Sequence, residues 1–146
     1  MTLTIRSIAC AVAVALVSAF GTVAAAQDTS GPLIVELNKF EEIEGGGCRS
    51  FFLFRNQTGL SFEGFQMSLA ILDSNSVIDR LLSIDAAPLP VARTTLKLFE
   101  IPDISCTGIS EILLHDMSSC KPQNADEMDC FAVLDLNSKT TAALVK

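Results

Sequence analysis

The chain has 146 residues, almost half of them hydrophobic, and a formal net charge of −7 at neutral pH. This length is enough for one domain and too short for two domains with separate cores. Because an acidic surface repels phosphate groups, the composition argues against nucleic-acid binding and against attachment to anionic lipid headgroups.

The first 26 residues differ from the rest and predict a secretory signal peptide. Arg6 is the only charge in this segment, an apolar run covers residues 8–20, and small residues fit cleavage after Ala26. The run is shorter than the roughly 20 residues of a membrane-spanning helix, so a membrane anchor is rejected. Cys10 precedes most of the run instead of following it, which argues against a lipoprotein.

The exported chain is therefore expected to be a single domain of residues 27–146, periplasmic or secreted, with no membrane span after cleavage. Without Arg6 it keeps nine Lys and Arg against seventeen Asp and Glu, a net charge of about −8.

Four cysteines remain after the expected cleavage, and they are Cys48, Cys106, Cys120 and Cys130. An even number of cysteines in an exported domain predicts disulfides, and four cysteines allow three pairings. No pair has the Cys-x-x-Cys spacing of a structural zinc site, so two disulfides are favoured over metal binding.

Short alternating segments separated by turn residues predict about eight strands and no long helix. The expected strands are residues 33–40, 48–56, 62–73, 77–85, 92–101, 108–117, 130–136 and 141–145.

The segment 48–56 is expected to be the central strand, because Gly45 to Gly47 precede it and turn-forming residues follow it. Both of its alternating sets contain apolar residues, which predicts that the strand is covered on both faces.

Local composition also predicts how several strands are connected. Segments 62–73 and 77–85 should form a hairpin around a turn at 73–76. Two prolines in 86–91 cannot donate to a ladder, so the chain should cross between sheets there. Segments 130–136 and 141–145 are expected to form a final pair.

The alternation within 92–101 predicts that Leu96 and Leu98 point inward and that Thr95 and Lys97 point outward.

Strands at intervals of roughly 8 to 12 residues, with one cysteine early and another late, predict an all-β, immunoglobulin-like antiparallel β-sandwich of about 7–8 strands. The tryptophan of antibody domains is absent, and Ile104 stands where their tyrosine precedes the second cysteine.

Three runs also resemble small exported proteobacterial proteins of unknown function. They read Phe-Phe-Leu-Phe-Arg-Asn-Gln-Thr at 51–58, Leu-Ala-Ile-Leu-Asp at 69–73 and Ser-Cys-Thr-Gly-Ile-Ser-Glu-Ile-Leu-Leu-His-Asp at 105–116. The resemblance implies a periplasmic address and a small β domain, and it implies no activity, ligand or catalytic residue.

An immunoglobulin-like strand order also bears on the cysteines. Cys106 and Cys120 flank an extended strand and lie too far apart to pair, since a disulfide needs Cα atoms within about 7 Å. Cys48 and Cys106 each precede a strand of the same direction, so they should meet at one end of the sandwich. We therefore expect Cys48 to pair with Cys106, and Cys120 with Cys130.

His115 is the only histidine, so a catalytic triad or a two-histidine metal site cannot be built in the usual way. The His115-x-Met117 spacing would put two copper ligands on one face of a strand, with Met67 or Met128 as a third ligand. Against this stands the simpler interpretation that both residues merely end a strand.

Other candidate motifs favour structural interpretations. The acidic loop with Asp126, Glu127 and Asp129 lacks the ligand spacing and turn glycine of a calcium loop. Gly45 to Gly47 have no Lys-Ser or Lys-Thr after them, so they predict a turn. Asn56-Gln57-Thr58 fits a glycosylation acceptor without further support.

The sequence thus predicts no catalytic residue and no cofactor. The expected function is a non-catalytic periplasmic binding or structural module, stabilised by two disulfides, with another envelope protein as a candidate partner. The alternatives are a periplasmic copper carrier that uses His115 and Met117, or an enzyme with an unrecognised site.

Overall fold

A computed structural model describes residues 30–146, and the expected signal peptide lies outside these described residues. The described chain is all-β. Its strands are β1 (Leu33–Glu42), β2 (Cys48–Asn56), β3 (Phe62–Asp73), β4 (Ile78–Asp85), β5 (Thr94–Ile101), β6 (Ile109–Pro122), β7 (Leu134–Ser138) and β8 (Ala143–Val145), and a short 3-10 helix, η1 (Cys106–Gly108), precedes β6.

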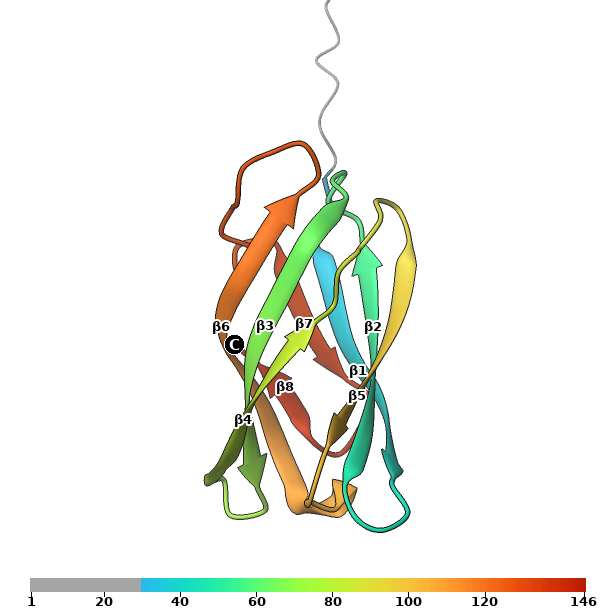
Figure 1. Ribbon diagram of the computed structural model, residues 1–146, viewed down its shortest axis with the longest axis vertical. Helices are drawn as coiled ribbons and strands as arrows, with labels where there is room; N and C mark the ends of the chain where they lie inside the picture. Colours follow the sequence, from blue (N-terminus) through green and yellow to red (C-terminus); the bar gives the residue numbers. More distant parts are fainter. Residues whose placement is uncertain (1–29) are drawn as a thin grey trace, which may run out of the picture.

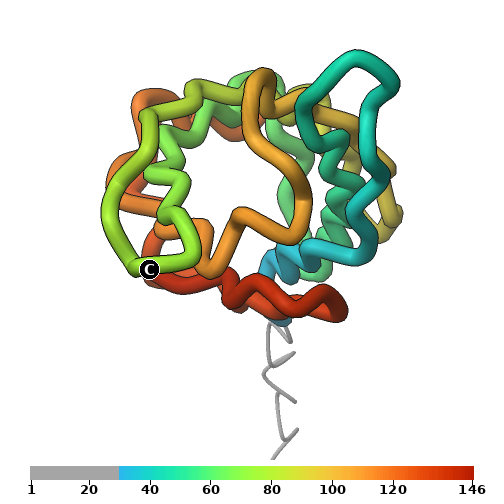
Figure 2. The backbone as a smooth tube through the Cα atoms, turned by 90° about the horizontal axis from the view of Figure 1, so that it is seen from below, coloured from blue at the N-terminus to red at the C-terminus, as the bar shows by residue number. Residues whose placement is uncertain are grey.

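The strands form two four-stranded sheets, ordered β5-β2-β1-β7 and β4-β3-β6-β8, that face each other as a sandwich (Figure 1). The view along the long axis shows the backbone as a closed outline around the core (Figure 2). The expected all-β sandwich is therefore confirmed. The pairs β1·β2, β2·β5, β3·β4 and β3·β6 are antiparallel, whereas β7 runs parallel to β1 and β8 runs parallel to β6.

Phenylalanine fills the core, since the chain contains no tryptophan or tyrosine. Phe54 of one sheet meets Phe65 of the other edge to face, with ring centroids 6.1 Å apart. Phe62 packs against Phe65 in the same way at 5.8 Å. Such edge-to-face pairs add stability beyond their buried area, and the Phe54–Phe65 pair helps hold the two sheets together.

The expected hairpin and crossing are both present. β3 and β4 pair antiparallel, and the segment between β4 and β5 carries the chain from one sheet to the other. The expected final pair is wrong, because β7 and β8 belong to different sheets. A short turn at 139–142 sends the chain across the sandwich instead of back along the same sheet.

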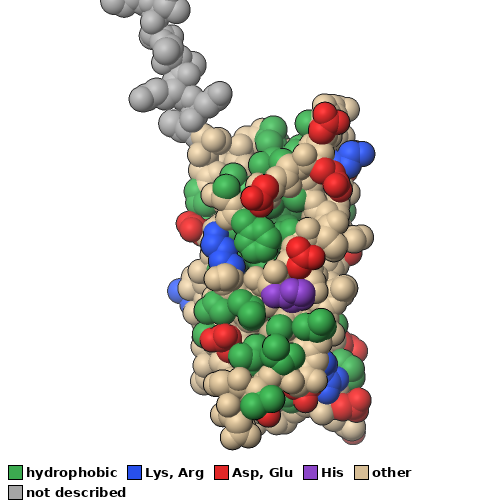
Figure 3. Space-filling model, turned by 90° about the vertical axis from the view of Figure 1, so that its left-hand side faces the viewer, with side chains coloured by type: hydrophobic (Ala, Val, Ile, Leu, Met, Phe, Trp, Pro, Cys, Tyr) green, Lys and Arg blue, Asp and Glu red, His purple; other side chains and the backbone are tan. Residues whose placement is uncertain are grey.

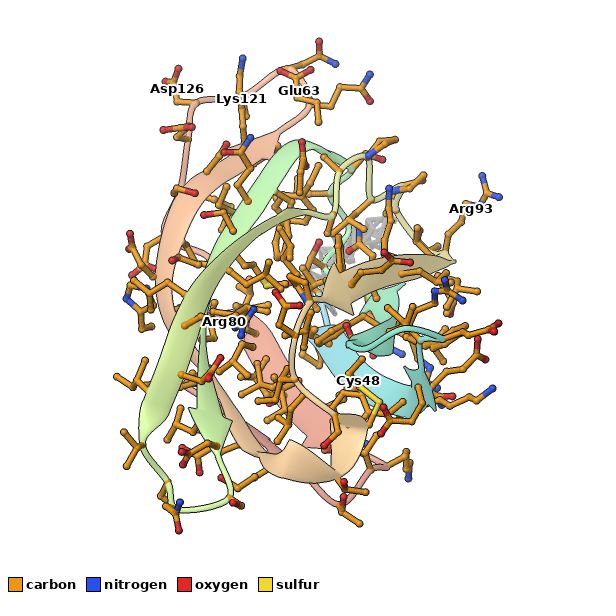
Figure 4. All side chains as sticks on the ribbon, turned by 60° about the horizontal axis from the view of Figure 1, so that its bottom comes forward. Cys48, Glu63, Arg80, Arg93, Lys121 and Asp126 are labelled. Carbon is orange, nitrogen blue, oxygen red and sulfur yellow. A yellow bond between two sulfur atoms is a disulfide. The ribbon has the colours of Figure 1, made fainter. Side chains whose placement is uncertain are left out.

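The disulfides lie at opposite ends of the sandwich. Cys48 at the start of β2 pairs with Cys106 in η1, with Cα atoms 4.9 Å apart (Figure 4). Cys120 near the end of β6 pairs with Cys130, with Cα atoms 6.0 Å apart. These pairs are the ones that the strand order predicted, although β6 extends past Met117 to Pro122 and so contains Cys120.

Candidate functional site

The outer faces of both sheets expose more apolar surface than the alternation of a half-buried sheet leads one to expect. Within residues 30–146, no group of three or more His, Cys, Asp or Glu side chains could hold a metal ion. The described helices include none that is long and apolar enough to cross a membrane. The candidate sites are therefore two surfaces.

The first surface, here called the β3–β6 face, is on the outer side of the β4-β3-β6-β8 sheet. It consists of Leu72, Ile78, Leu81, Leu113, Ala143 and Val145, which lie around the fully covered Ala70.

Strand register brings these residues together in two adjacent rows. One row runs Leu81, Ala70, Leu113, Val145 across all four strands. The row beside it runs Ile78, Leu72, Glu111, Ala143, so a single carboxylate interrupts the apolar surface. Ile78 and Leu81 remain 58% and 62% exposed. Figure 3 shows hydrophobic side chains on both sides of the single histidine on this side of the molecule.

His115 marks the polar border of the β3–β6 face. Its Nε2 lies 2.8 Å from the hydroxyl oxygen of Ser68 on the neighbouring strand. No sequence pattern indicates this pair, because only the register of β3 with β6 brings the two residues together. Ser68 is the only hydrogen-bond partner of His115 within residues 30–146, so no third group orients the imidazole as a catalytic triad requires.

The predicted copper ligands do not converge. β-Bulges flank this stretch of β6, so His115 faces outward with Ser68 while Met117 packs against the core. Met67 is fully buried opposite Met117, and Met128 packs against the core from the loop after β6. The alternation rule that placed His115 and Met117 on one face fails here because a bulge adds a residue to one strand.

Carboxylates border the β3–β6 face, and Lys146, the residue after Val145, donates to the carbonyls of Phe131 and Leu134. Glu111 lies within the apolar rows, and Asp116 and Asp85 are exposed beyond them. Lys121 pairs with Glu63 at 2.9 Å, at the end of the sheet away from these rows (Figure 4). That carboxylate raises the pKa of Lys121. The border of this face is therefore acidic.

The second surface, here called the β2–β5 face, is on the outer side of the other sheet and consists of Phe51, Leu53, Leu96 and Leu98. Phe51 lies opposite Leu98, and Leu53 lies opposite Leu96. Leu96 and Leu98 are 53% and 49% exposed.

The expected inward orientation of these leucines is wrong. Thr95 and Lys97 lie opposite the buried Phe54 and Phe52, and cross-strand partners share a face. Phe99 and Ile101 continue this inward set, so they fix the orientation of β5. β2 is correspondingly fully buried on one face only, because Phe51 and Leu53 on its outer face are partly exposed.

Charged side chains surround the β2–β5 face in pairs. Arg49 binds Glu41 at 3.0 Å and Glu100 at 2.8 Å. The Glu100 hydrogen bond is the main cause of the raised pKa of Arg49. Lys39, whose hydrogen bond lowers the pKa of Glu41, lies 5.1 Å from the centre of the Phe51 ring. These charges sit at one end of the apolar stripe.

Glu36 is a buried carboxylate at the other end. Only 4% of its side chain is exposed, and it accepts hydrogen bonds from Arg55, Asn38 and Asn137. The Arg55 hydrogen bond, followed by that of Asn38, lowers the pKa of Glu36. Because its donors lie on β1, β2 and β7, this network also attaches the parallel edge strand to the sheet.

Two other predicted features have structural roles. Asn56 is buried and its amide donates to the carbonyls of Leu60, Leu89 and Pro90, so it does not present a glycosylation acceptor in the folded protein. In the acidic loop, Glu127 accepts a hydrogen bond from the hydroxyl of Ser119, and Asp129 accepts one from the backbone N–H of Phe131.

A hollow of about 380 Å³ lies beside the start of β1. Pro32, Leu60, Phe62, Met128 and Leu134 contribute to its mainly apolar lining. The hydroxyl of Thr58, one of its polar groups, is already bound by Asn56. The hollow therefore lacks a convergent set of polar groups.

Comparison with known proteins shows the fold alone. No protein-family model and no curated protein matches the chain. A solved structure of IrmA from Escherichia coli is similar, with a TM-score of 0.56 and 13% sequence identity, over 72% of this chain and 90% of that one.

Proposed function

We propose that this protein is a non-catalytic binding module, periplasmic or secreted, that holds a protein partner on the β3–β6 face. The observation that carries the proposal is the pair of neighbouring rows in which Glu111 is the only charged residue. Soluble proteins seldom leave contiguous apolar patches in water unless a partner covers them.

The acidic border identifies the chemistry of the partner. Glu111 lies within the apolar rows, Asp85 and Asp116 lie beyond them, and the whole chain carries a net charge of −7. Opposite charges at the rim speed encounter and suppress wrong partners. The partner is therefore an apolar protein surface with lysine or arginine at its edge, and a second copy of this acidic chain fits the β3–β6 face poorly.

Export is supported by the two disulfides, since such bonds persist in oxidising compartments. The proposal expects a mature protein that begins at Gln27. Intact-mass measurement of protein from the periplasm and the culture medium tests this, and a full-length chain retained in the membrane fraction would contradict it.

The binding proposal is tested by placing a photoreactive amino acid at Leu81 and, as a control, at the exposed Gln57 at the other end of the sandwich. Leu81 should form an adduct with a basic protein that Gln57 does not capture. The captured protein is then purified and its affinity measured directly.

Leu81→Glu should weaken that affinity at least tenfold, since it places a charge among the apolar rows that the partner removes from water. Glu111→Lys should weaken it as well, because it reverses the sign of a charge that attracts the basic partner. Leu98→Glu, on the opposite face, is the matched control and should leave it unchanged. Equal adducts at both probe positions, or an affinity that Leu81→Glu leaves unchanged, would refute the assignment of the partner site to the β3–β6 face.

A hydrolase based on Ser68 and His115 is the catalytic alternative, because the two side chains are within hydrogen-bond reach. The pair stands on an open sheet face with no orienting group on the imidazole, which favours the binding function. Ser68→Ala should accordingly change neither partner affinity nor any turnover of the partner, and loss of such turnover would favour an enzyme.

A further inference from the structure

We infer that the β2–β5 face is where two copies of this chain associate face to face, in a dimer that leaves both β3–β6 faces open. The inference rests on the opposite side of the sandwich from the proposed partner site and does not depend on that partner.

The apolar centre of the contact is compact. Phe51, Leu53, Leu96 and Leu98 form two cross-strand pairs on neighbouring strands, and both leucines expose about half of their surface. Leucine and phenylalanine gain about 25 cal/mol for each Å² of apolar surface removed from water. Covering this stripe is favourable for any partner, so its surroundings must decide which partner fits.

The surroundings carry both signs of charge on a protein that is otherwise acidic. The four strands of this sheet contribute three cations and four carboxylates to this face, and they are Lys39, Arg49, Arg55, Glu36, Glu41, Glu100 and Asp135. The β3–β6 face, by contrast, is bordered by carboxylates. The mixed-sign face is therefore where a second copy of this acidic chain meets the least repulsion, and a two-fold axis makes the contact self-complementary.

Pairing along the edge of β5 is disfavoured, which points to the face. Lys97 points inward from this edge strand and donates to the carbonyl of Ala87 at 2.9 Å. Arg80 on the facing edge strand β4 donates to the carbonyl of Pro102 in the same manner. Inward-pointing charges on edge strands protect sheets from edge-to-edge association. The β5 and β4 edges are therefore closed to a further strand.

The size of the face sets the strength of the dimer. Four strands about 4.8 Å apart and about seven residues of 3.3 Å each cover roughly 19 by 23 Å. That area, near 440 Å² on each copy before side-chain relief is added, is about half of the roughly 800 Å² that a stable interface buries on each partner, and it is in the range of weak, transient contacts. A dissociation constant in the upper micromolar range is expected, so the dimer forms where the protein is concentrated.

The test is a concentration series of the purified protein in sedimentation velocity, from about 1 μM to 1 mM, with two matched variants. The wild type should shift from one copy to two copies across this range. Leu98→Glu should remain monomeric throughout, because each dimer would bury two added carboxylates. Leu81→Glu carries the same chemical change on the β3–β6 face and should dimerise as the wild type does.

Hydrogen exchange on the wild type gives a measurement without substitution. Peptides from residues 94–101 and 48–56 should exchange more slowly at 1 mM than at 1 μM, while peptides from 78–85 should not change. Should Leu98→Glu fail to fold by circular dichroism, Leu96→Glu takes its place.

A wild type that stays monomeric at 1 mM would overturn the inference. So would a dimer that Leu81→Glu abolishes and Leu98→Glu preserves, which would assign self-association to the β3–β6 face and contradict its proposed partner as well. Partner binding that survives Leu98→Glu while dimerisation is lost would establish that the two surfaces act separately.

Discussion

The disulfide between Cys48 and Cys106 should stabilise the fold more than the one between Cys120 and Cys130. The first closes a loop with a sequence separation of 58 residues and the second closes one of 10. The chain-entropy relation gives about 4.2 kcal/mol for the longer loop and about 2.7 kcal/mol for the shorter one. Their difference, about 1.5 kcal/mol, is the quantity to measure.

The comparison uses two double variants, Cys48→Ala with Cys106→Ala, and Cys120→Ala with Cys130→Ala. All four side chains are buried, so each variant removes two buried sulfur atoms and the cavity contributions largely cancel. Alanine also leaves no free thiol that could form a wrong disulfide. The remaining difference in unfolding free energy between the two variants therefore reports the entropy of loop closure and the position of each bond in the fold.

The assay is urea unfolding followed by far-ultraviolet circular dichroism, since the chain has no tryptophan or tyrosine to report by fluorescence. The variant without Cys48 and Cys106 should have the lower unfolding free energy, by about 1.5 kcal/mol, or about tenfold in the unfolding equilibrium. Equal losses in the two variants, or a greater loss without Cys120 and Cys130, would show that loop length does not govern stability here.

Three further predictions concern single residues. Asn56→Asp should cost about 3 kcal/mol or more in urea unfolding, because a buried carboxylate would face three carbonyl oxygens that now accept from the amide; a loss under about 1 kcal/mol would contradict this network. The pKa of Glu36 is lowered from 4.5 by Arg55, so its stabilisation is present above that pH and is lost as the pH falls through the folded pKa. Glu36→Gln should therefore flatten the fall in unfolding free energy between about pH 5 and pH 2, and unchanged steepness would argue against the ion pair as its cause. Gly47→Ala should destabilise more than Gly46→Ala, because both have positive φ but only at Gly47 would a Cβ lie 3.1 Å from a backbone oxygen; equal melting temperatures would refute the clash.

The sequence by itself determined the strands, the sandwich and the positions of the cysteines. Turn residues and prolines act locally, so they place the ends of β2, β3 and β4 within about one residue of the expected bounds. The number of strands between Cys48 and Cys106 sets the relative direction of the strands that they precede. The sequence therefore predicts that these two cysteines meet at one end of the sandwich and pair.

Only the tertiary structure decided which side chains face water. In β5 both alternating sets contain large apolar residues, so the sequence pattern could not show that Leu96 and Leu98 point outward. Register with the buried Phe52 and Phe54 settles their orientation, and register is a long-range property.

The same reason explains the other differences. A β-bulge separates His115 from Met117 and brings His115 to Ser68, 47 residues earlier in the chain. β7 and β8 join different sheets because their partners, β1 and β6, lie on opposite sides of the core. A one-residue change in register moves side chains to the other face of a sheet. The pairing of the strands therefore decides which residues form the two candidate surfaces.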